Sequence, residues 1–408
     1  MSGIRSGGRP RESWGREMED DDTAGTAPLS ELSRAVAVDI LVHGPRSRLQ
    51  LAKSMGLSAA TLTRLVKPLL EAGVLAETEP VRTPGRGRAS MPLDVVAEQH
   101  RFIGVKLTTE SIYAVVTDLR ARILDTCVQP IRSLDVPDVI AEVAEIVADF
   151  RSRGGPSIDA VGVTVGGLVD AGEIVADSPF MHWREVPLRA LLAERLGLPV
   201  QLDNDVVGLT QAQHWFGVGR GHSDFALLTV GAGIGYGLVL NNAMIRTEVT
   251  PVSHFPIDPY GPLCPLGHRG CMTGYLTSGA ITSAVSGGLG RPVGYDEVLD
   301  LAVAGDPVAR RIVDEAARAL GQAAAGVSAL TGVQRIILSG EGVHLAEVAR
   351  AALDEGLRRY AGVRGPNTEV VIRSMGFLEW ARGAATIAIQ RDFAGGVGSA
   401  TAGLIGPS

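Results

Sequence analysis

The chain has 408 residues, of which 45% are apolar and 20% charged, and its formal net charge is −7. This size and composition are typical of a globular protein with two or three domains and a substantial core. The longest apolar runs fall short of the roughly 20 residues that span a bilayer, and the N-terminus lacks an apolar signal region, so we expect neither membrane association nor secretion. Three cysteines are too few for a disulfide framework, which favours a reducing cytoplasm.

The N-terminal part of the chain differs in charge from the rest. Residues 1–28 are polar, glycine-rich and without periodicity, and we predict a disordered tail there. A small domain is predicted over residues 29–96. Between residues 29 and 100, nine lysines and arginines stand against seven acids, whereas the residues after 100 are net acidic. A locally basic domain suits a polyanion such as DNA.

Three helices are predicted in this domain, over about Ser30 to Val42, Ser47 to Met55 and Ser58 to Glu71. Gly44-Pro45 and Gly56 end the first two, and Ser58 is a good N-cap for the third. The second and third helices form a helix-turn-helix pattern, which places the third in the major groove of double-stranded DNA. The candidate DNA contacts in and around these helices are Arg46, Arg48, Ser58, Ala59, Thr61, Thr63, Arg64 and Lys67.

A β wing is predicted after the third helix. Val74-Leu75 and Met91-Pro92-Leu93 flank a polar turn that contains Pro84-Gly85-Arg86-Gly87-Arg88. A narrow cationic turn suits the minor groove, and Arg82, Arg86 and Arg88 are its candidate contacts. The alternative to a winged helix is a three-helix packing module with solvated arginines.

After residue 100 the pattern changes to strands that alternate with helices. A hairpin is predicted at IGVKLTTESIYAVVTDL (103–119), a glycine-broken hairpin at FALLTVGAGIGYGLVLN (225–241) and a buried strand at RIILSG (335–340). Helices are predicted over about residues 136–153, 316–330 and 377–392. We therefore expect an α/β domain over residues 100–393, with two lobes around a cleft, and a flexible tail over residues 394–408.

Four segments carry a resemblance to a known family. They are VGVTVGGLVD (161–170), the stretch from Trp183 through Leu202 into DNDVV, VGAGIGYGLVLN (230–241) and GPLCPLGHRGC (261–271). In this order they resemble the ROK family, which groups sugar kinases with sugar-responsive transcription factors. The resemblance implies a two-lobed actin-like, ribonuclease-H-like ATPase fold after the winged helix-turn-helix. The DNA-binding extension points to the regulatory branch of the family.

The first hairpin departs from the kinase pattern. ROK kinases have an Asp and two glycines there, for Mg²⁺ and the ATP phosphates, whereas this chain has Lys106, Thr108 and Thr109. An ammonium group cannot coordinate a metal, and side chains crowd the approach of phosphate to the backbone. We therefore expect neither ATP binding nor enzyme activity. The alternative is that Lys106 contacts phosphate directly.

The sugar side of the cleft matches the family better. The resemblance places Asn204 and Asp205 on sugar hydroxyls, with Asp205 as a vestigial general base, and puts Gly166, Gly167 and His254 beside the sugar. The alternative for Asn204 and Asp205 is a turn and helix cap. Two glutamates of the family pattern are missing, because the first region reads TPVSH and Thr273 stands at the second position. A modified sugar, a phosphorylated sugar, a weakly bound sugar or no effector all remain open.

The segment HFPIDPYGPLCPLGHRGC predicts a metal site. His254, Cys264 and Cys271 match three of the four family ligands for structural zinc, but Leu266 replaces the remaining cysteine. His268 is close enough in sequence to supply the fourth bond, and imidazole and thiolate both suit tetrahedral Zn²⁺. An empty loop with buried thiols, or a regulatory metal or redox role, are the alternatives. Cys127 is predicted to lie in the core.

The function expected from these features is that of a DNA-binding regulator of carbohydrate uptake or metabolism genes, acting as a repressor. A sugar or amino sugar in the cleft would modulate binding to a palindromic operator by a homodimer or homotetramer. An ATP-dependent sugar kinase and a ligand-independent architectural DNA-binding protein are the alternatives.

Overall fold

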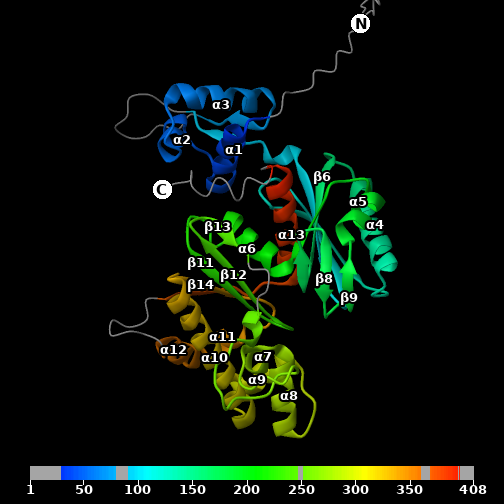
Figure 1. Cartoon of the computed structure of the whole chain (residues 1–408), viewed down its shortest axis with the longest axis vertical. Coiled ribbons are helices and arrows are strands. Elements are labelled where there is room, and N and C mark those ends of the chain that lie inside the picture. The colour runs from blue at the N-terminus through cyan, green and yellow to red at the C-terminus, as the bar shows by residue number, and fades with distance from the viewer. Residues whose placement is uncertain (1–28, 80–90, 247–250, 360–367, 394, 396–408) are drawn as a thin grey trace, which may run out of the picture.

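The computed structural model describes residues 29–79, 91–246, 251–359, 368–393 and 395. The predicted tails, most of the wing and its arginines Arg82, Arg86 and Arg88 lie outside these residues. Figure 1 shows an N-terminal domain above two α/β lobes. Within the described residues, no helix combines the length and apolar character needed to cross a membrane.

The N-terminal domain has the predicted helices and the base of the wing. Each helix begins at a serine whose side chain accepts a hydrogen bond from a backbone N–H of the first turn, and the cap at Ser47 is a complete capping box with Gln50. The short strands pair antiparallel, with Leu75 opposite Val95. The elements are α1 (Glu31–His43), α2 (Arg48–Ser54), α3 (Ala59–Glu71), β1 (Leu75–Glu77) and β2 (Leu93–Val95), and a 3₁₀ turn (Ala97–Gln99) leads to the first lobe.

The first lobe is built on a five-stranded mixed sheet with the order β10-β6-β3-β4-β5. The two helices α4 (Val136–Ser152) and α5 (Leu188–Leu196) pack together on one face, and α13 (Phe377–Asp392) packs on β3 and β6. The strands of the sheet are β3 (Arg101–Leu107), β4 (Ser111–Thr117), β5 (Ile123–Pro130), β6 (Ile158–Val165) and β10 (Val200–Asn204). A small antiparallel sheet joins them, with β7 (Leu168–Asp170), β8 (Ile174–Ser178) and β9 (Trp183–Val186).

The second lobe has a five-stranded sheet with the order β13-β12-β11-β14-β15. Its strands are β11 (Phe225–Val230), β12 (Ile234–Leu240), β13 (Ala243–Ile245), β14 (Arg335–Ser339) and β15 (Glu369–Ile372). The helices are α6 (Asp205–Phe216), α7 (Met272–Leu276), α8 (Ser278–Leu289), α9 (Tyr295–Ala304), α10 (Pro307–Thr331), α11 (Leu345–Val348) and α12 (Arg350–Arg358), and a 3₁₀ turn covers Pro251–His254. The helix predicted over residues 316–330 is therefore too short, because α10 begins at Pro307 with Asp306 as its N-cap.

Glycines let α13 approach the first sheet at backbone distance. A Cβ added to Gly104 on β3 would lie 2.0 Å from the carbonyl oxygen of Ala381, and one added to Gly162 on β6 would lie 1.9 Å from that of Ala384. The same helix crosses α6 where Gly383 meets Gly208, and a Cβ on Gly383 would lie 2.7 Å from the Gly208 carbonyl carbon. Because α6 packs on the second sheet, this crossing joins the two lobes.

One apolar cluster extends from the N-terminal domain into the first lobe. It contains Val36, Ile40 and Leu69 of the N-terminal domain together with Phe102 of β3, and it continues to the C-terminal ends of α6 and α13. The residues that these two helices contribute are Trp215, Ala385, Ala388 and Ile389. The N-terminal domain and the first lobe therefore share a core.

Substitution of Gly104 by Ala tests this backbone packing. The new methyl group would meet the α13 backbone, which cannot rotate away, so we expect a loss of about 1–3 kcal/mol in the free energy of unfolding, as for other overpacked cores. Gly287→Ala is the matched control, because Gly287 lies in α8 with nothing within 4 Å of an added Cβ. Chemical denaturation should show a neutral or slightly stabilising effect for the control. Equal stability of the two variants would contradict this packing.

Candidate functional site

A cleft of about 670 Å³ lies between the two lobes. The β3–β4 turn and the turn before β7 line it from the first lobe, and the N-terminus of α6 and the β11–β12 turn line it from the second. The predicted residues that the structure brings to this cleft are Lys106, Thr108, Thr109, Gly166, Gly167, Asn204, Asp205 and His254.

Lys106 and Asp205 form an ion pair in the floor of the cleft. The Lys106 ammonium donates a hydrogen bond to Asp205 Oδ2, and it also lies 5.5 Å from the centre of the Trp380 ring. Lys106 is only 5% exposed, so water cannot compete effectively for its charge. The Asp205 carboxylate is therefore compensated by a lysine of β3, a strand that β6 separates from β10 in the sheet.

The β3–β4 turn is closed on itself by a side chain. The Thr108 hydroxyl donates to the Ser111 carbonyl oxygen at 2.8 Å and accepts hydrogen bonds from the backbone N–H groups of Ser111 at 3.0 Å and Glu110 at 3.3 Å. These amides are the groups that a glycine turn would offer to an anion. The sequence predicted that the Thr108 side chain would hinder the approach of phosphate to the backbone. In the structure its hydroxyl also accepts the hydrogen bonds of two backbone N–H groups of the turn.

Asn204 joins the end of β10 to the turn before β7. Its Oδ1 caps α6 by accepting from the N–H groups of Val206 at 2.8 Å and Val207 at 3.4 Å, and its Nδ2 donates to the Gly167 carbonyl oxygen at 2.8 Å. Gly167 has φ +136°, and an added Cβ would lie 2.3 Å from the Asp177 carbonyl oxygen. This position therefore requires glycine. Asn204 therefore acts as the N-cap of α6, which was the alternative to sugar contact. Gly166 lies beside Asp205, because a Cβ added to it would lie 3.4 Å from Asp205 Oδ2.

Asp203 lines the same cleft and was not among the predicted residues. It is 3% exposed and pairs with Arg246, whose Nη2 lies 2.6 Å from Oδ2, and with Arg391, whose Nη2 lies 3.0 Å from Oδ2. Burial lowers the pKa of the Arg391 guanidinium, and Asp203 opposes this effect. The only sequence signal was an acid at the end of a buried strand, because both arginines are far away in the chain.

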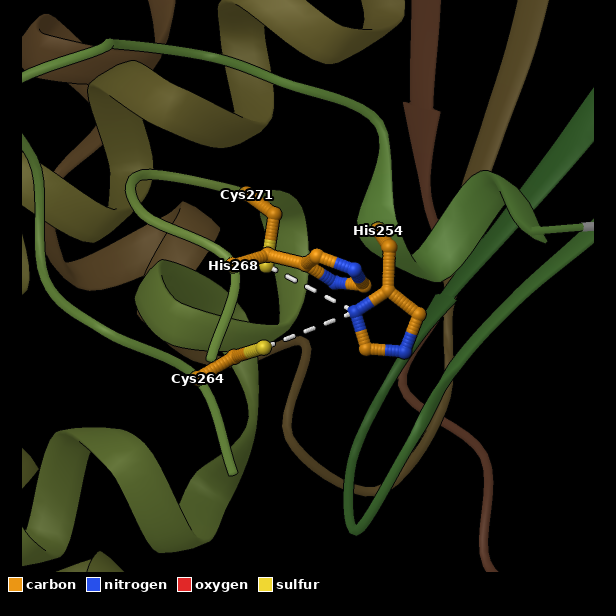
Figure 2. A group of neighbouring side chains, drawn as sticks. All are labelled: His254, Cys264, His268 and Cys271. Atoms are coloured by element: carbon orange, nitrogen blue, oxygen red, sulfur yellow. Dashed lines mark hydrogen bonds between the residues drawn. The ribbon is translucent and has the colours of Figure 1, made fainter. Parts of the chain in front are cut away.

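The four predicted metal ligands come together beside the cleft (Figure 2). His254 Nδ1 lies 3.7 Å from the sulfur of Cys264 and 3.7 Å from that of Cys271, and the ring centres of His254 and His268 are 4.7 Å apart. All four ligand atoms lie within 4.8 Å of one another, which fits a tetrahedral ion with bonds of roughly 2.0–2.3 Å. Leu266, at the position of the missing cysteine, is 70% exposed and takes no part in the group.

The pKa values in this group shift in different directions: burial raises that of the Cys271 thiol, whereas those of His254 and Cys264 are lowered. Burial, together with the nearby His268, lowers the pKa of His254, so its ring is neutral near pH 7. Burial opposes ionisation of Cys264, but hydrogen bonds from the backbone of Leu266 and His268 outweigh it and lower the pKa of the thiol. Cys127 is half-buried on β5 at the edge of the first-lobe core, away from this group.

The N-terminal domain places the predicted α3 contacts on its surface. Ser58, Ala59, Thr63, Arg64 and Lys67 are exposed, and Thr61 is half-buried. Ser58 accepts from the Thr61 N–H at 3.1 Å, and Lys67 lies 3.7 Å from Glu71. Arg46 and Arg48 were also predicted as DNA contacts, but both side chains are held in ion pairs. Arg46 donates to the fully buried Asp39 at 2.9 Å, whereas Arg48 pairs with Glu77 at 2.7 Å on the surface.

Comparison with known proteins places the chain among regulators and kinases. It is 24% identical to the DNA-binding transcriptional repressor Mlc of Escherichia coli over 335 residues, which cover 78% of this chain and 82% of the repressor. It is 31% identical to a glucokinase of Thermotoga maritima over 284 residues, which cover 64% of this chain and 88% of the kinase.

A solved structure of a ROK family transcriptional regulator, a homologue of Escherichia coli Mlc, has the same fold. It covers 90% of this chain and 98% of its own, with a TM-score of 0.76 and 23% identity. The ROK family profile matches residues 102–391, which includes both lobes and the cleft between them. The chain belongs to the ROK family.

Proposed function

We propose that this protein is a transcriptional repressor of carbohydrate genes, and that a sugar or amino sugar in the cleft modulates its binding to DNA in the cytoplasm. The observation that carries the proposal is the shared core, in which a winged helix-turn-helix is joined to the two helices that begin at the cleft. A shared core is not needed for catalysis by a fused enzyme domain. A regulator, by contrast, requires that ligand binding at one site be coupled to binding at the other.

The cleft itself favours regulation over phosphoryl transfer. A general base must be able to accept a proton from the hydroxyl that attacks the phosphate. The carboxylate of Asp205 instead accepts a hydrogen bond from the Lys106 ammonium group. In the β3–β4 turn, the backbone N–H groups of Glu110 and Ser111 donate to the Thr108 hydroxyl. They are therefore not free to bind a phosphate. Similarity to a glucokinase is therefore best explained by common fold and sugar recognition rather than by retained kinase activity.

The DNA contacts are best assigned to α3. Its exposed face carries Thr63, Arg64 and Lys67, and a helix of this kind enters the major groove with its N-terminal part on the bases. We assign Arg46 to the stability of the domain, because its guanidinium compensates the buried Asp39. A homodimer or homotetramer on a palindromic operator, with Arg82, Arg86 and Arg88 in the minor groove, completes the proposal.

The two central helices provide the route between the sites. Asp205 begins α6 in the cleft, and Trp215 near its other end lies in the core shared with the N-terminal domain. Phe377 begins α13 in the cleft, and Ile389 near its end lies in the same core. A ligand that draws the lobes together would change the angle between these helices, which would move the ends that support the DNA-binding domain.

The sugar would bind near Gly166, Gly167 and Asp205, with His254 on the opposite wall. The His254 side of this wall is fixed by the metal group and by Thr273, whose hydroxyl donates to the Ser253 carbonyl oxygen at 2.7 Å. Thr273 stands where the family pattern has a glutamate, so this position tethers the loop instead of offering a carboxylate to the ligand. We assign zinc to the metal group as a structural ion that would be held by His254, Cys264, His268 and Cys271.

Sugar binding and the lack of phosphoryl transfer can be tested together. A thermal-shift screen of hexoses, pentoses and amino sugars should give a ligand that raises the melting temperature by a few degrees when it is present at about 100 times its dissociation constant. The same ligand should change operator affinity in a gel-shift titration. Turnover of ATP with any of these sugars at enzymatic rates would defeat the proposal.

DNA binding by α3 is tested by Arg64→Ala. Loss of a guanidinium that contacts a base or phosphate should weaken operator binding by roughly 1–3 kcal/mol, or about 5-fold to 150-fold. Arg311→Ala is the matched control, since Arg311 is an exposed arginine on α10 in the second lobe. Both variants should retain the thermal shift with sugar. Unchanged operator affinity for Arg64→Ala would remove α3 from the interface.

The metal assignment is tested by elemental analysis of purified protein. Wild-type protein should hold one zinc per chain, and His268→Ala should lose most of it, because three ligands hold the ion less tightly than four. His222→Ala is the matched control, because it removes an exposed imidazole outside the group. A full zinc content in His268→Ala would show that the fourth ligand is another group or water.

A further inference from the structure

We infer that Glu341 fills the glycine-rich turn of the second lobe and thereby excludes phosphate groups from this half of the cleft. The inference rests on the proposed function and deepens it, because it restricts the ligand to a sugar without a phosphate or a similar polyanionic group. Nothing in the sequence drew attention to Glu341, which lies in a short Ser-Gly-Glu-Gly turn after β14.

The carboxylate of Glu341 is bound to the turn between β11 and β12. The backbone N–H of Ala232 donates to Glu341 Oε1 at 2.8 Å. A Cβ added to the neighbouring Gly231 would lie 1.9 Å from the same oxygen, so the carboxylate lies against the bare backbone of that glycine. Glycine turns with free N–H groups are common anion sites in proteins. Here the anion is a side chain of the protein itself.

The backbone around Glu341 is fixed in a position that directs the side chain to this turn. Gly340 has φ +97°, a conformation that favours glycine, and an added Cβ would lie 2.4 Å from the Val230 carbonyl oxygen. The N–H of Gly342 donates to that same carbonyl oxygen at 2.8 Å, and the hydroxyl of Tyr295 donates to the Gly342 carbonyl oxygen at 2.5 Å. Glu341 is half-buried between these anchored glycines. Its contact with Ala232 is therefore held by the fold.

An incoming phosphate would meet two obstacles in this turn. The Ala232 amide is already engaged, and the carboxylate would be brought within a few ångströms of a second negative charge. Like charges at such short distance are unfavourable, most strongly in a partly desolvated site. The charge repulsion acts on phosphorylated sugars and nucleotides but not on a neutral sugar. Among the effectors left open by the sequence, Glu341 therefore disfavours the phosphorylated ones.

Inorganic tripolyphosphate is a suitable probe, because it offers the charge and geometry of a nucleotide tail without base or sugar. We expect calorimetric titration of the wild-type chain to show no saturable binding at millimolar concentration. Glu341→Gly should open the turn and tighten tripolyphosphate binding at least tenfold. Glu341→Gln keeps an oxygen acceptor but removes the charge, so its affinity should fall between the two.

Glu347→Gln is the matched control for net charge, since Glu347 is an exposed acid on α11 that pairs with His344. This variant should bind tripolyphosphate no better than the wild-type chain. If Glu341→Gly does not fold, as judged from its melting curve, Glu341→Gln decides the question. Saturable wild-type binding as tight as that of the variants, or no gain in either folded Glu341 variant, would overturn the inference.

Operator binding and the sugar thermal shift of the wild-type chain are measured separately. They report on the proposed function, so its failure can be distinguished from failure of the Glu341 assignment.

Discussion

The contact of α13 with its neighbours at backbone distance is the constraint on which the arrangement of the molecule depends. Gly104 and Gly162 place the helix directly on two adjacent parallel strands, and Gly383 places it directly on α6. The contacts with the two strands leave α13 little freedom to shift on the first sheet, because the closest atoms belong to the main chain on both sides. The cleft end of α13 and the end that supports the N-terminal domain are therefore fixed relative to the first sheet.

Elements with strong periodicity or clear caps could be predicted from the sequence. The helix over residues 377–392 matches α13, and the predicted cap at Ser58 locates the start of α3. The three short strands β7, β8 and β9 were not separated, because each has too few residues for alternation to be visible. The start of α10 was missed although Asp306-Pro307 is a regular start signal, since the alanine-rich part of the helix dominated the pattern.

The interaction partners of the site residues were harder to predict than the site residues themselves. Lys106 stood out as a departure from the kinase pattern, but its partner Asp205 lies 99 residues further along the chain. Asp39 lay within an apolar helix face, which was a signal that some cation must be close to it, and that cation is Arg46. Glu341 gave no signal at all, since a glutamate between two glycines reads as an ordinary loop.

Ion pairing in the cleft stabilises a fold that this chain shares with the glucokinase it resembles. A buried carboxylate without a partner would be costly, and removal of one member of a buried ion pair typically costs about 3–5 kcal/mol. Once a lysine occupies position 106, the acid at position 205 therefore stabilises the cleft floor as half of a pair. In the second lobe, Glu341 likewise satisfies an amide that would otherwise require water or a ligand.

In each lobe, a side chain of the protein accepts the hydrogen bonds of the backbone N–H groups in the cleft turn. Under the proposed function, the energy of ligand binding would then act on the angle between the lobes. A change in that angle would also change the angle between α6 and α13, whose far ends lie in the core shared with the N-terminal domain. Under the proposed function, a sugar that prefers one angle would by linkage change the affinity for DNA that prefers another, and DNA would change the affinity for the sugar by the same factor.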